Sequence, residues 1–534
     1  MKHSFPSRRS AVMSRHGIVA TSQPLAAQAG VSMLLQGGNA IDAAIATAAA
    51  LNVVEPMSTG LGGDAFALVY LSNSNKLKAL NASGRAPYAA NLETFRNLGY
   101  REMPSVGIHT VTIPGTLDGW CSLLDNYGTM SLAQVLVPAI GLAENGFPVT
   151  EIIGYAWKNN SAKLQSNDAA AHTYLIDRRA PEPGEIFRQP DLAMTFQKIV
   201  EGGRDVFYRG EIAEAIVACS QENGGLITMQ DLNEHTSTWV TPISTNYHGY
   251  DMYECPPNGQ GLVALLALNI LEGYDLRSLG HNSSEYLHLV IEAVKLAFAD
   301  ADRYVADLDF VDIPLEGLLS KSYTEQRRHL INANKARQVV EAGIPATQGD
   351  TVYLAVTDKD GNSVSFINSL YAEFGSGIVV EGTGVCLQNR GSLFSLEADH
   401  PNCIAPHKRP YHTIIPAMVF KDGNLFLTFG VMGSFMQPQG HIQVLLNIVD
   451  FDMDVQRALD APRFNYIQGS GCAFEPGISP SIRQELANKG HYIAKQNDSS
   501  QQFGGGQVIT VHPQTKALIA GSDPRKDGCA IGIW

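Results

Sequence analysis

The feature that most constrains the fold is a β-hairpin signal in the middle of the chain. Residues 351–370, TVYLAVTDKDGNSVSFINSL, form two alternating runs rich in β-branched residues around the turn sequence DKDG. Such a pattern is typical of two antiparallel strands joined by a tight loop. The stretch directly before it, 331–349, is polar and shows no helical or strand period. The pattern therefore predicts a sheet that begins at Thr351, after a long exposed loop.

The remaining sequence alternates between helical and strand-like patterns. Apolar residues at three- and four-residue spacing predict helices over 22–56, with a break at Gly37–Gly38, and helical patterns dominate from about 117 to 330. Before the hairpin, shorter runs predict a strand at 65–71 and a second strand that ends at Gly84. After the hairpin, they predict strands at 377–380, 412–420, 424–430, 506–512 and 516–522, and a helix at 441–450. We expect an α/β (α+β) protein with an antiparallel sheet in its second part, covered by helices.

Composition excludes several classes of protein. Acidic residues outnumber basic ones by 52 to 38, and without a basic run this charge disfavours a nucleic-acid surface. The longest uncharged apolar stretches, 43–54 and 261–271, have about half of the roughly 20 residues that a bilayer requires. The first twenty residues lack the apolar core of a secretory signal, so we expect a cytoplasmic protein. Seven scattered cysteines without a CxxC pair predict free thiols.

Three glycine clusters are candidates for ligand binding: GLGGDAF, FGSGIVVEGTG and FGVMGS. None has the strand–glycine–helix order with GK[ST] that binds nucleotide phosphates, and we interpret the first two as tight turns that require positive φ. The third follows a strand, so its backbone amides are candidates for binding an oxyanion. The fifteen histidines include no HExxH and no pair accompanied by carboxylates at ligand spacing, so we expect neither a metal nor a cofactor.

Thr351 admits two interpretations. A threonine that begins a strand is most often only a strand residue. If the chain is cut in front of it, the released α-amine, with a reference pKa of about 7.7–8.0, is a base attached to the nucleophile itself. Folding the hairpin about DKDG places Thr351 opposite residues 368–370, so Ser369 is predicted to hydrogen-bond the Thr351 hydroxyl. A shift of one residue in register would turn Ser369 away.

Recognisable motifs follow one another along nearly the whole chain. They are GGNAIDAAIATAAALNVVEPMSTGLGGDAF, PGTLDGW, YGTMSLAQVLVPAIGLAENGF, GGLITMQDL, EAVKLAFADADRY, GDTVYLAVTDKDGNSVSFINSLYAEFGSGIV, KRPYHTIIPAM, FGVMGSFMQPQGHIQ and GSDPR. In sequence and in order they resemble the γ-glutamyltranspeptidase (glutathione hydrolase) family of N-terminal-nucleophile hydrolases. The resemblance includes a divergent branch with oxamate amidohydrolases and cephalosporin acylases.

The resemblance implies a precursor that cuts itself between Asp350 and Thr351. Residues 1–350 would become a large chain and 351–534 a small chain, with 331–349 as a mobile loop that moves away from the site. Both chains would form one four-layer αββα sandwich. The partners implied are these two chains and a small-molecule amide, without nucleic acid or membrane.

The resemblance also assigns catalytic roles. Thr351 matches the nucleophile, Ser369 matches a threonine that hydrogen-bonds it, and Gly433 and Ser434 match two glycines whose amides form the oxyanion hole. Arg85 matches an arginine that holds the substrate's α-carboxylate. The alternative for Arg85 is a surface ion pair.

Several substrate-binding positions depart from the family pattern. Tyr371, Arg390 and Leu393 stand where the family has asparagine, glutamine and aspartate, and His412 and Thr413 replace a serine pair that binds carboxylate. A substrate ammonium facing Leu393 and Arg390 would be unpaired and repelled. The departures therefore favour a substrate with a carboxylate but without a free α-amine.

The combined prediction is an autoprocessed threonine amidohydrolase that cleaves a carboxylate-bearing amide, oxamate-like or glutaryl-like, through an acyl-enzyme on Thr351. One alternative is a true γ-glutamyltranspeptidase acting on γ-glutamyl amides such as glutathione. A second alternative, from another class, is an uncleaved relative that only binds its ligand.

Overall fold

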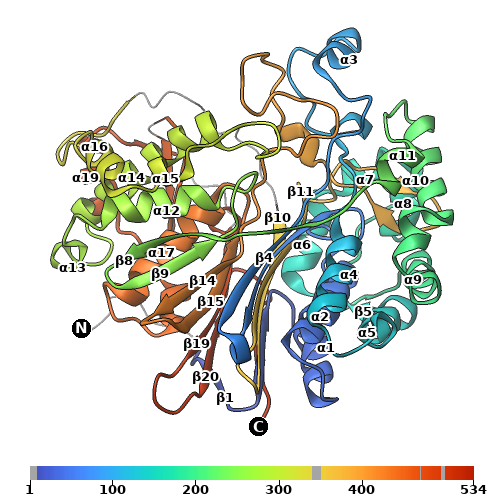
Figure 1. Cartoon of the computed structure of the whole chain (residues 1–534), viewed down its shortest axis with the longest axis horizontal. Helices are drawn as coiled ribbons and strands as arrows, with labels where there is room; N and C mark the ends of the chain where they lie inside the picture. The colour runs from blue at the N-terminus through green and yellow to red at the C-terminus, as the bar shows by residue number, and fades with distance from the viewer. Residues whose placement is uncertain (1–8, 339–349, 470, 495–499) are drawn as a thin grey trace.

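Two seven-stranded antiparallel sheets lie face to face in the computed structural model, which describes residues 9–338, 350–469, 471–494 and 500–534 (Figure 1). We call the sheet that contains the central hairpin the hairpin sheet and the other the partner sheet. The hairpin sheet has the order β21 (Cys529–Gly532), β2 (Gly17–Thr21), β10 (Asp350–Asp358), β11 (Ser363–Tyr371), β3 (Asp64–Leu71), β4 (Lys76–Ala82), β7 (Thr238–Val240). The partner sheet has the order β1 (Val12–Ser14), β20 (Leu518–Ser522), β19 (Gly505–Val511), β15 (Asn424–Met432), β14 (Ala417–Lys421), β9 (Tyr250–Glu254), β8 (Ile243–Tyr247).

Helices cover the outer face of each sheet. The hairpin sheet packs against α1 (Pro24–Leu35), α2 (Ala40–Val54) and α4 (Thr116–Tyr127). The partner sheet packs against α12 (Gly261–Leu271) and α17 (Met436–Val449). One apolar core lies between each sheet and its helices, and a third lies between the two sheets. The third core includes Phe66, Tyr353, Ile367, Met418 and Ile509. The predicted α/β class and the αββα layering are confirmed.

The predicted hairpin is also confirmed. Residues 352–357 of β10 pair with 363–368 of β11 in one continuous antiparallel register. Asp358 closes the turn, because its Oδ1 accepts hydrogen bonds from the N–H groups of Asp360 (2.9 Å) and Asn362 (3.0 Å). Its Oδ2 accepts the Ala40 N–H at 3.0 Å. The same carboxylate therefore closes the hairpin and attaches it to the positive N-terminus of α2.

The location of the sheets differs from the prediction. An antiparallel sheet was expected in the second part, whereas both sheets combine strands from both parts of the chain. The strands β2, β8 and β9 were not predicted, and the run at 377–380 forms only the two-residue strand β12 (Val379–Val380). The reason is that a short strand gains most of its stability from neighbours far away in sequence, which local patterns do not report.

The loop predicted over 331–349 is only partly described. Residues 339–349 lie outside the described part of the chain. Residues 331–338 are held against the body of the protein: Ala336 N–H donates to the Lys489 carbonyl at 2.7 Å, and Arg337 N–H donates to Glu292 at 3.1 Å. This part of the predicted loop is mostly exposed, as expected, and hydrogen bonds attach it to the body of the protein.

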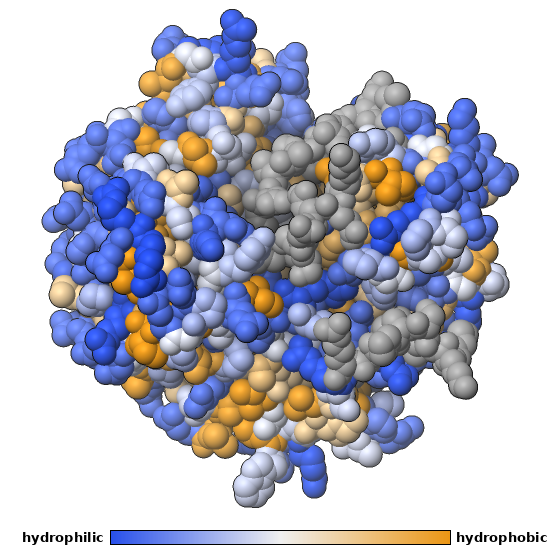
Figure 2. Space-filling view, turned by 180° about the vertical axis from the view of Figure 1, so that it is seen from behind, coloured by the Kyte–Doolittle hydropathy of each residue, from blue (hydrophilic) through white to orange (hydrophobic). Residues whose placement is uncertain are grey.

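The surface carries apolar residues in small groups. Figure 2 shows a mainly hydrophilic face, with the largest apolar group along its lower edge. Exposed large apolar side chains such as Met13, Leu35 and Val137 come from different elements, as is normal for a protein surface. Among the described residues, no helix is both long enough and apolar enough to cross a bilayer.

The glycine clusters have two different explanations. In the second cluster Gly375, Gly377, Gly382 and Gly384 have positive φ, as predicted. In the first cluster that prediction is wrong, because no glycine of GLGGDAF has positive φ. Close packing requires glycine there instead: a Cβ on Gly62 would lie 2.0 Å from the carbonyl oxygen of Cys386.

Substituting Gly62 tests this packing. We expect Gly62→Ala to lower the free energy of unfolding by about 3 kcal/mol, because the new methyl group meets backbone that cannot move aside. The matched control is Gly141→Ala inside helix α5 (Leu132–Asn145), where an added Cβ has no neighbour within 4 Å. This control should gain about 0.5–1 kcal/mol. Urea unfolding of both variants is the measurement, and equal stabilities would contradict the packing argument.

Candidate functional site

The hairpin brings the two hydroxyls of the predicted nucleophile pair together. Thr351 lies near the start of β10 and Ser369 near the end of β11, and both side chains are buried. Their oxygens, Thr351 Oγ1 and Ser369 Oγ, are 3.0 Å apart. The predicted contact is therefore present, while the catalytic roles of the two residues stay predictions.

Ser369 Oγ also contacts two further groups of the site. It accepts the Tyr371 N–H at 2.8 Å and an N–H from Arg390 Nη2 at 3.1 Å. A serine hydroxyl can accept and donate at the same time, so one oxygen can contact the Tyr371 backbone, the Arg390 guanidinium and the Thr351 hydroxyl together. Ser369 therefore joins the predicted nucleophile to the buried arginine.

The backbone is irregular at the same place. The register of β10 and β11 shifts between Asp350 and Val352, across the peptide bond that the resemblance predicts to be cut. Opposite this shift, Tyr371 has a φ of 78°, which is uncommon for a bulky residue. Bulges and positive φ values concentrate at functional sites, where they redirect a side chain or hold a strained bond.

Arg390 begins the 3-10 helix η3 (Arg390–Leu393) and is completely buried beside this pair. Its Nη1 donates to Thr413 Oγ1 at 2.6 Å, and its guanidinium lies 4.5 Å from the ring centre of Tyr371. Its Nε has no partner among the described residues. Burial lowers the pKa of Arg390 to about 10, and the charge of Asp64 opposes this effect. The site therefore contains a desolvated cation next to Ser369.

The predicted oxyanion turn joins β15 to α17. Gly433 has a φ of 122° and Ser434 a φ of 54°. Gly433 O accepts the Met436 N–H at 2.9 Å, and Ser434 O accepts Gln260 Nε2 at 2.9 Å. The N–H groups of Gly433 and Ser434 donate to no other described residue. With its carbonyls held and these amides available, the turn has the donors that an oxyanion hole needs.

Gln260 connects this turn to the buried arginine. The same Nε2 that holds Ser434 O also donates to the Thr413 carbonyl at 2.7 Å, and Thr413 Oγ1 accepts from Arg390. Hydrogen bonds thus link Thr351, Ser369, Arg390, Thr413 and Ser434 without a break. Sequence reasoning missed Gln260, which precedes α12 and carries no motif of its own.

A buried acid behind the arginine was also missed. Asp64 accepts the Gly84 N–H at 2.8 Å, Gln388 Nε2 at 2.9 Å and His412 Nε2 at 3.0 Å. Burial raises the pKa of Asp64 to about 6, against the lowering effect of Arg390. Burial holds the pKa of His412 well below its usual value, so the imidazole is neutral. The sequence did contain a signal for Asp64, because it is an acid within the glycine cluster GLGGDAF, directly before a predicted strand.

Two predicted residues do not join this network through any described contact. Arg85 donates to the Thr236 carbonyl at 3.2 Å and lies 3.7 Å from Asp309, whose side chain is 68% exposed. This arrangement agrees with the ion-pair alternative for Arg85. Leu393 is half-buried, and its carbonyl accepts Asn402 Nδ2 at 2.6 Å. Roles for both in substrate binding stay predictions.

Comparisons with known proteins decide the family. The model of the gamma-glutamyltranspeptidase family matches residues 26–533. The chain belongs to this family. It is 40% identical to the glutathione hydrolase-like YwrD proenzyme of Bacillus subtilis (strain 168) over 526 residues, which cover 97% of this chain and 98% of that protein.

Two further relatives narrow the kind of enzyme. The chain is 34% identical to the oxamate amidohydrolase proenzyme of Klebsiella pneumoniae over 532 residues, covering 97% of this chain and 99% of the relative. The crystal structure of a cephalosporin acylase from Bacillus halodurans superposes with a TM-score of 0.94 at 45% identity, over 100% of this chain and 98% of the other. The protein is therefore an enzyme of the amidohydrolase and acylase kind, with the N-terminal-nucleophile hydrolase fold.

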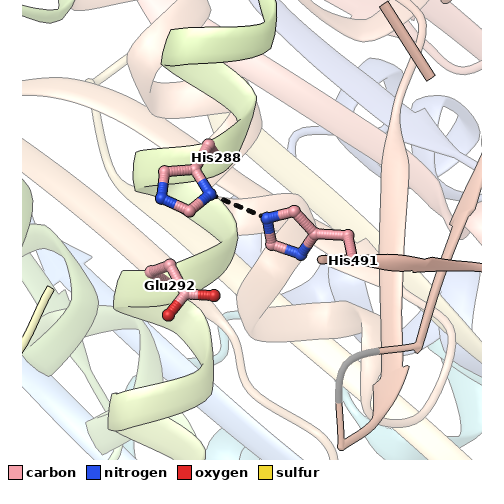
Figure 3. A group of neighbouring side chains, drawn as sticks. All are labelled: His288, Glu292 and His491. Atoms are coloured by element: carbon pink, nitrogen blue, oxygen red, sulfur yellow. Dashed lines mark hydrogen bonds between the residues drawn. The ribbon is translucent and has the colours of Figure 1, made fainter. Parts of the chain in front are cut away.

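This member of the γ-glutamyltranspeptidase family has a second polar cluster, away from the Thr351 network. His288 and Glu292, one turn apart on α14 (Ser284–Tyr304), meet His491, and their ligand-type atoms lie within 4.8 Å of one another (Figure 3). Sequence reasoning did not find this group, because His491 is 203 residues from His288 in sequence. Only tertiary structure could bring the three together.

The cluster has the hydrogen bonds of a structural link rather than those of a cation site. We call it the tie, because His288 and Glu292 hydrogen-bond the main chain of residues 331–338. Lys295 Nζ already donates to Glu292 Oε1 at 2.7 Å and supplies positive charge there. His288 Nε2 donates to the Asn332 carbonyl at 2.8 Å, so its Nδ1 accepts from His491 Nε2, also at 2.8 Å. Burial, together with the nearby Lys295, lowers the pKa of His491 to about 3, so the ring stays neutral. The tie holds the main chain of residues 331–338.

Removing one histidine tests the tie. We expect His288→Ala to lower the free energy of unfolding by about 3 kcal/mol, since the Asn332 carbonyl and His491 Nε2 both lose a buried partner. Trypsin should also cut faster within 331–338. The control is His329→Ala, an exposed residue whose ring nitrogen Nδ1 hydrogen-bonds the Glu325 carbonyl one turn earlier at 2.8 Å. Unchanged proteolysis of His288→Ala would show that the tie does not hold this segment.

Proposed function

We propose that this enzyme is a self-processing threonine amidohydrolase that uses Thr351 as its nucleophile. The observation that carries the proposal is the 3.0 Å contact between Thr351 Oγ1 and Ser369 Oγ, located at the strand irregularity that follows Asp350. The position of Ser369 supports it, because a hydrogen bond between the two hydroxyls would hold the Thr351 oxygen in place. Several relatives are named as proenzymes, which agrees with a precursor that is cut.

Maturation would proceed by an N-to-O acyl shift. Thr351 Oγ1 attacks the carbonyl carbon of Asp350, the C–N bond to Thr351 breaks, and an ester forms on the threonine oxygen. Water then hydrolyses this ester. The products are a carboxylate at Asp350 and an α-amine at Thr351, so the step creates the base that later turnover needs.

The mature site would use the same atoms for substrate. The Thr351 α-amine accepts the proton of Oγ1, and the oxygen attacks the substrate's amide carbonyl. The N–H groups of Gly433 and Ser434 would stabilise the oxyanion, and the leaving amine would take the proton. Water then hydrolyses the acyl-enzyme. In this step the α-amine accepts a proton from the attacking water, and Thr351 Oγ1 is the leaving group that takes a proton back. Ser369 keeps Thr351 Oγ1 oriented in both half-reactions.

The buried arginine supports a substrate whose acyl group bears a carboxylate. Among the described residues, no carboxylate oxygen forms an ion pair within 4.0 Å of Arg390, and its Nε lacks a partner. A substrate carboxylate would supply both the charge and the hydrogen-bond acceptors, whereas an ammonium would be repelled. Oxamate-like and glutaryl-like amides fit this requirement, in agreement with the names of two relatives.

Self-cleavage is the first test. Purified wild-type protein should give two bands, of about 38 and 20 kDa by proportion of the 57.6 kDa chain, and Thr351→Ala should give one inactive band. The matched control is Thr428→Ala, a buried strand threonine whose hydroxyl has no partner among the described residues. It should be cut normally. A single 57.6 kDa band for the wild type would favour a non-catalytic binding protein, and turnover by Thr351→Ala would exclude the mechanism.

Substrate preference is the second test. We expect the enzyme to hydrolyse glutaryl-p-nitroanilide or oxamate in preference to γ-glutamyl-p-nitroanilide, because the latter brings an ammonium towards Arg390. The double variant Arg390→Gln, Leu393→Asp restores the family residues. It should shift the ratio of kcat/KM towards the γ-glutamyl substrate by about tenfold or more, since a charge-assisted hydrogen bond contributes about 1.5–3 kcal/mol. A wild-type preference for the γ-glutamyl substrate would identify a true γ-glutamyltranspeptidase instead.

A further inference from the structure

Among the described residues, Asp64 is the carboxylate that interacts electrostatically with the buried Arg390, although the two side chains form no ion pair within 4.0 Å. It is the carboxylate whose charge acts on the pKa of Arg390, and Arg390 acts in return on the pKa of Asp64. Both residues are completely buried. The role inferred for Asp64 rests on the proposed function, because it concerns how the same site responds to a carboxylate-bearing substrate.

The hydrogen bonds of Asp64 leave space for one proton. Its Oδ1 accepts hydrogen bonds from Gly84 and Gln388, and the backbone N–H of Gly115 also lowers the pKa of Asp64. Oδ2 accepts a hydrogen bond from His412. An ionised carboxylate has about four lone-pair positions, so Oδ2 has capacity for a hydrogen. Asp64 can therefore exist in either protonation state without losing these partners.

The other charged groups around Asp64 keep a constant charge near neutral pH. Arg390 faces it from η3, and Arg409 and His412 face it from the segment before β14. His412 is neutral, because burial and the two arginines lower its pKa. Arg409 stays cationic, with a pKa of about 10, and donates to the Ser83 carbonyl at 3.1 Å. Asp64 is thus the group that can change its charge.

We propose that Asp64 takes up one proton from solvent when an anionic acyl group binds beside Arg390, so that Asp64 controls the affinity for carboxylate-bearing substrates. With Asp64 ionised, its charge already balances Arg390. A substrate carboxylate then adds a second negative charge to a buried site of low dielectric, where like charges repel strongly. Protonation of Asp64 removes this repulsion, and the charge of Arg390 is then balanced by the substrate carboxylate alone.

The sign of the pH dependence follows from the direction of this proton uptake. The pKa of Asp64 is about 6 in the unoccupied site, and binding of an anion raises it further. Affinity for the anionic substrate therefore increases as the pH falls through this range. The lower limit is set by the substrate's own carboxyl, which loses its charge near pH 4.3. The affinity for the anionic substrate should therefore change with pH between about pH 5 and 8, and the affinity for an uncharged acyl group should not.

The experiment compares two p-nitroanilides of equal chain length on cleaved enzyme: the glutaryl compound, with a terminal carboxylate, and the valeryl compound, without one. For wild type, KM for the glutaryl substrate should rise about tenfold between about pH 5.5 and 8.0, while KM for the valeryl substrate stays constant. Asp64→Asn imitates the protonated acid. It should have a low KM for the glutaryl substrate that no longer changes with pH.

A second variant keeps the acid and changes only one of its partners. Gln388 Nε2 donates to Asp64 Oδ1 at 2.9 Å and more weakly to the Ile113 carbonyl at 3.5 Å, and Gln388 Oε1 has no partner among the described residues. Gln388→Met removes the hydrogen bond to Asp64 at similar side-chain volume. This bond stabilises the ionised form of Asp64. Its loss should move the rise in KM to higher pH, which a purely structural role of Asp64 would not do. This variant decides the matter if Asp64→Asn does not fold.

The possible outcomes separate this inference from the proposed function. If the wild-type enzyme is cut but hydrolyses none of the amides, the proposed function fails. If it hydrolyses them and KM for the glutaryl substrate is independent of pH, only the role of Asp64 fails. The role of Asp64 also fails if Asp64→Asn retains the wild-type pH dependence, or if this variant raises KM for both substrates equally.

Discussion

The candidate site depends on one hydroxyl oxygen, Ser369 Oγ. It accepts the Tyr371 N–H and an N–H of Arg390, and it lies 3.0 Å from Thr351 Oγ1. A single atom therefore contacts both the proposed nucleophile and the buried cation. The hydroxyl matters here rather than the identity of the residue, since serine and threonine offer the same three hydrogen-bonding positions.

This arrangement requires close approach of backbone segments behind the hairpin. A Cβ on Gly63 would lie 2.4 Å from the Ser369 carbonyl oxygen, and a Cβ on Gly84 would lie 1.6 Å from the Ile113 carbonyl oxygen. Two glycines of GLGGDAF, Gly62 and Gly63, are thus explained by close backbone contacts rather than by turn conformation. They allow Asp64 to begin a central strand behind Arg390, in a completely buried position.

The charges of the site explain how this chain differs from the pattern of its family. A buried guanidinium costs free energy unless a counter-charge or hydrogen bonds offset it. Here two hydroxyls, the face of Tyr371 and the more distant Asp64 share that task. The incomplete compensation is a reason to expect an anionic substrate, and the adjacent acid is a means by which the protein can adjust to one.

The sequence by itself determined the hairpin, the Thr351–Ser369 contact and the family, because these depend on a local alternating pattern, a two-residue side-chain period and ordered motifs. It could not place Gln260, Asp64 or the His288–His491 pair, and it missed several first-part strands that complete the two sheets. Those features join residues that are far apart in sequence, and burial dominates the charge states of the acid, the arginine and the histidine. Only the tertiary structure decides which distant groups share a buried interior, because desolvation and hydrogen bonding act between neighbours in space.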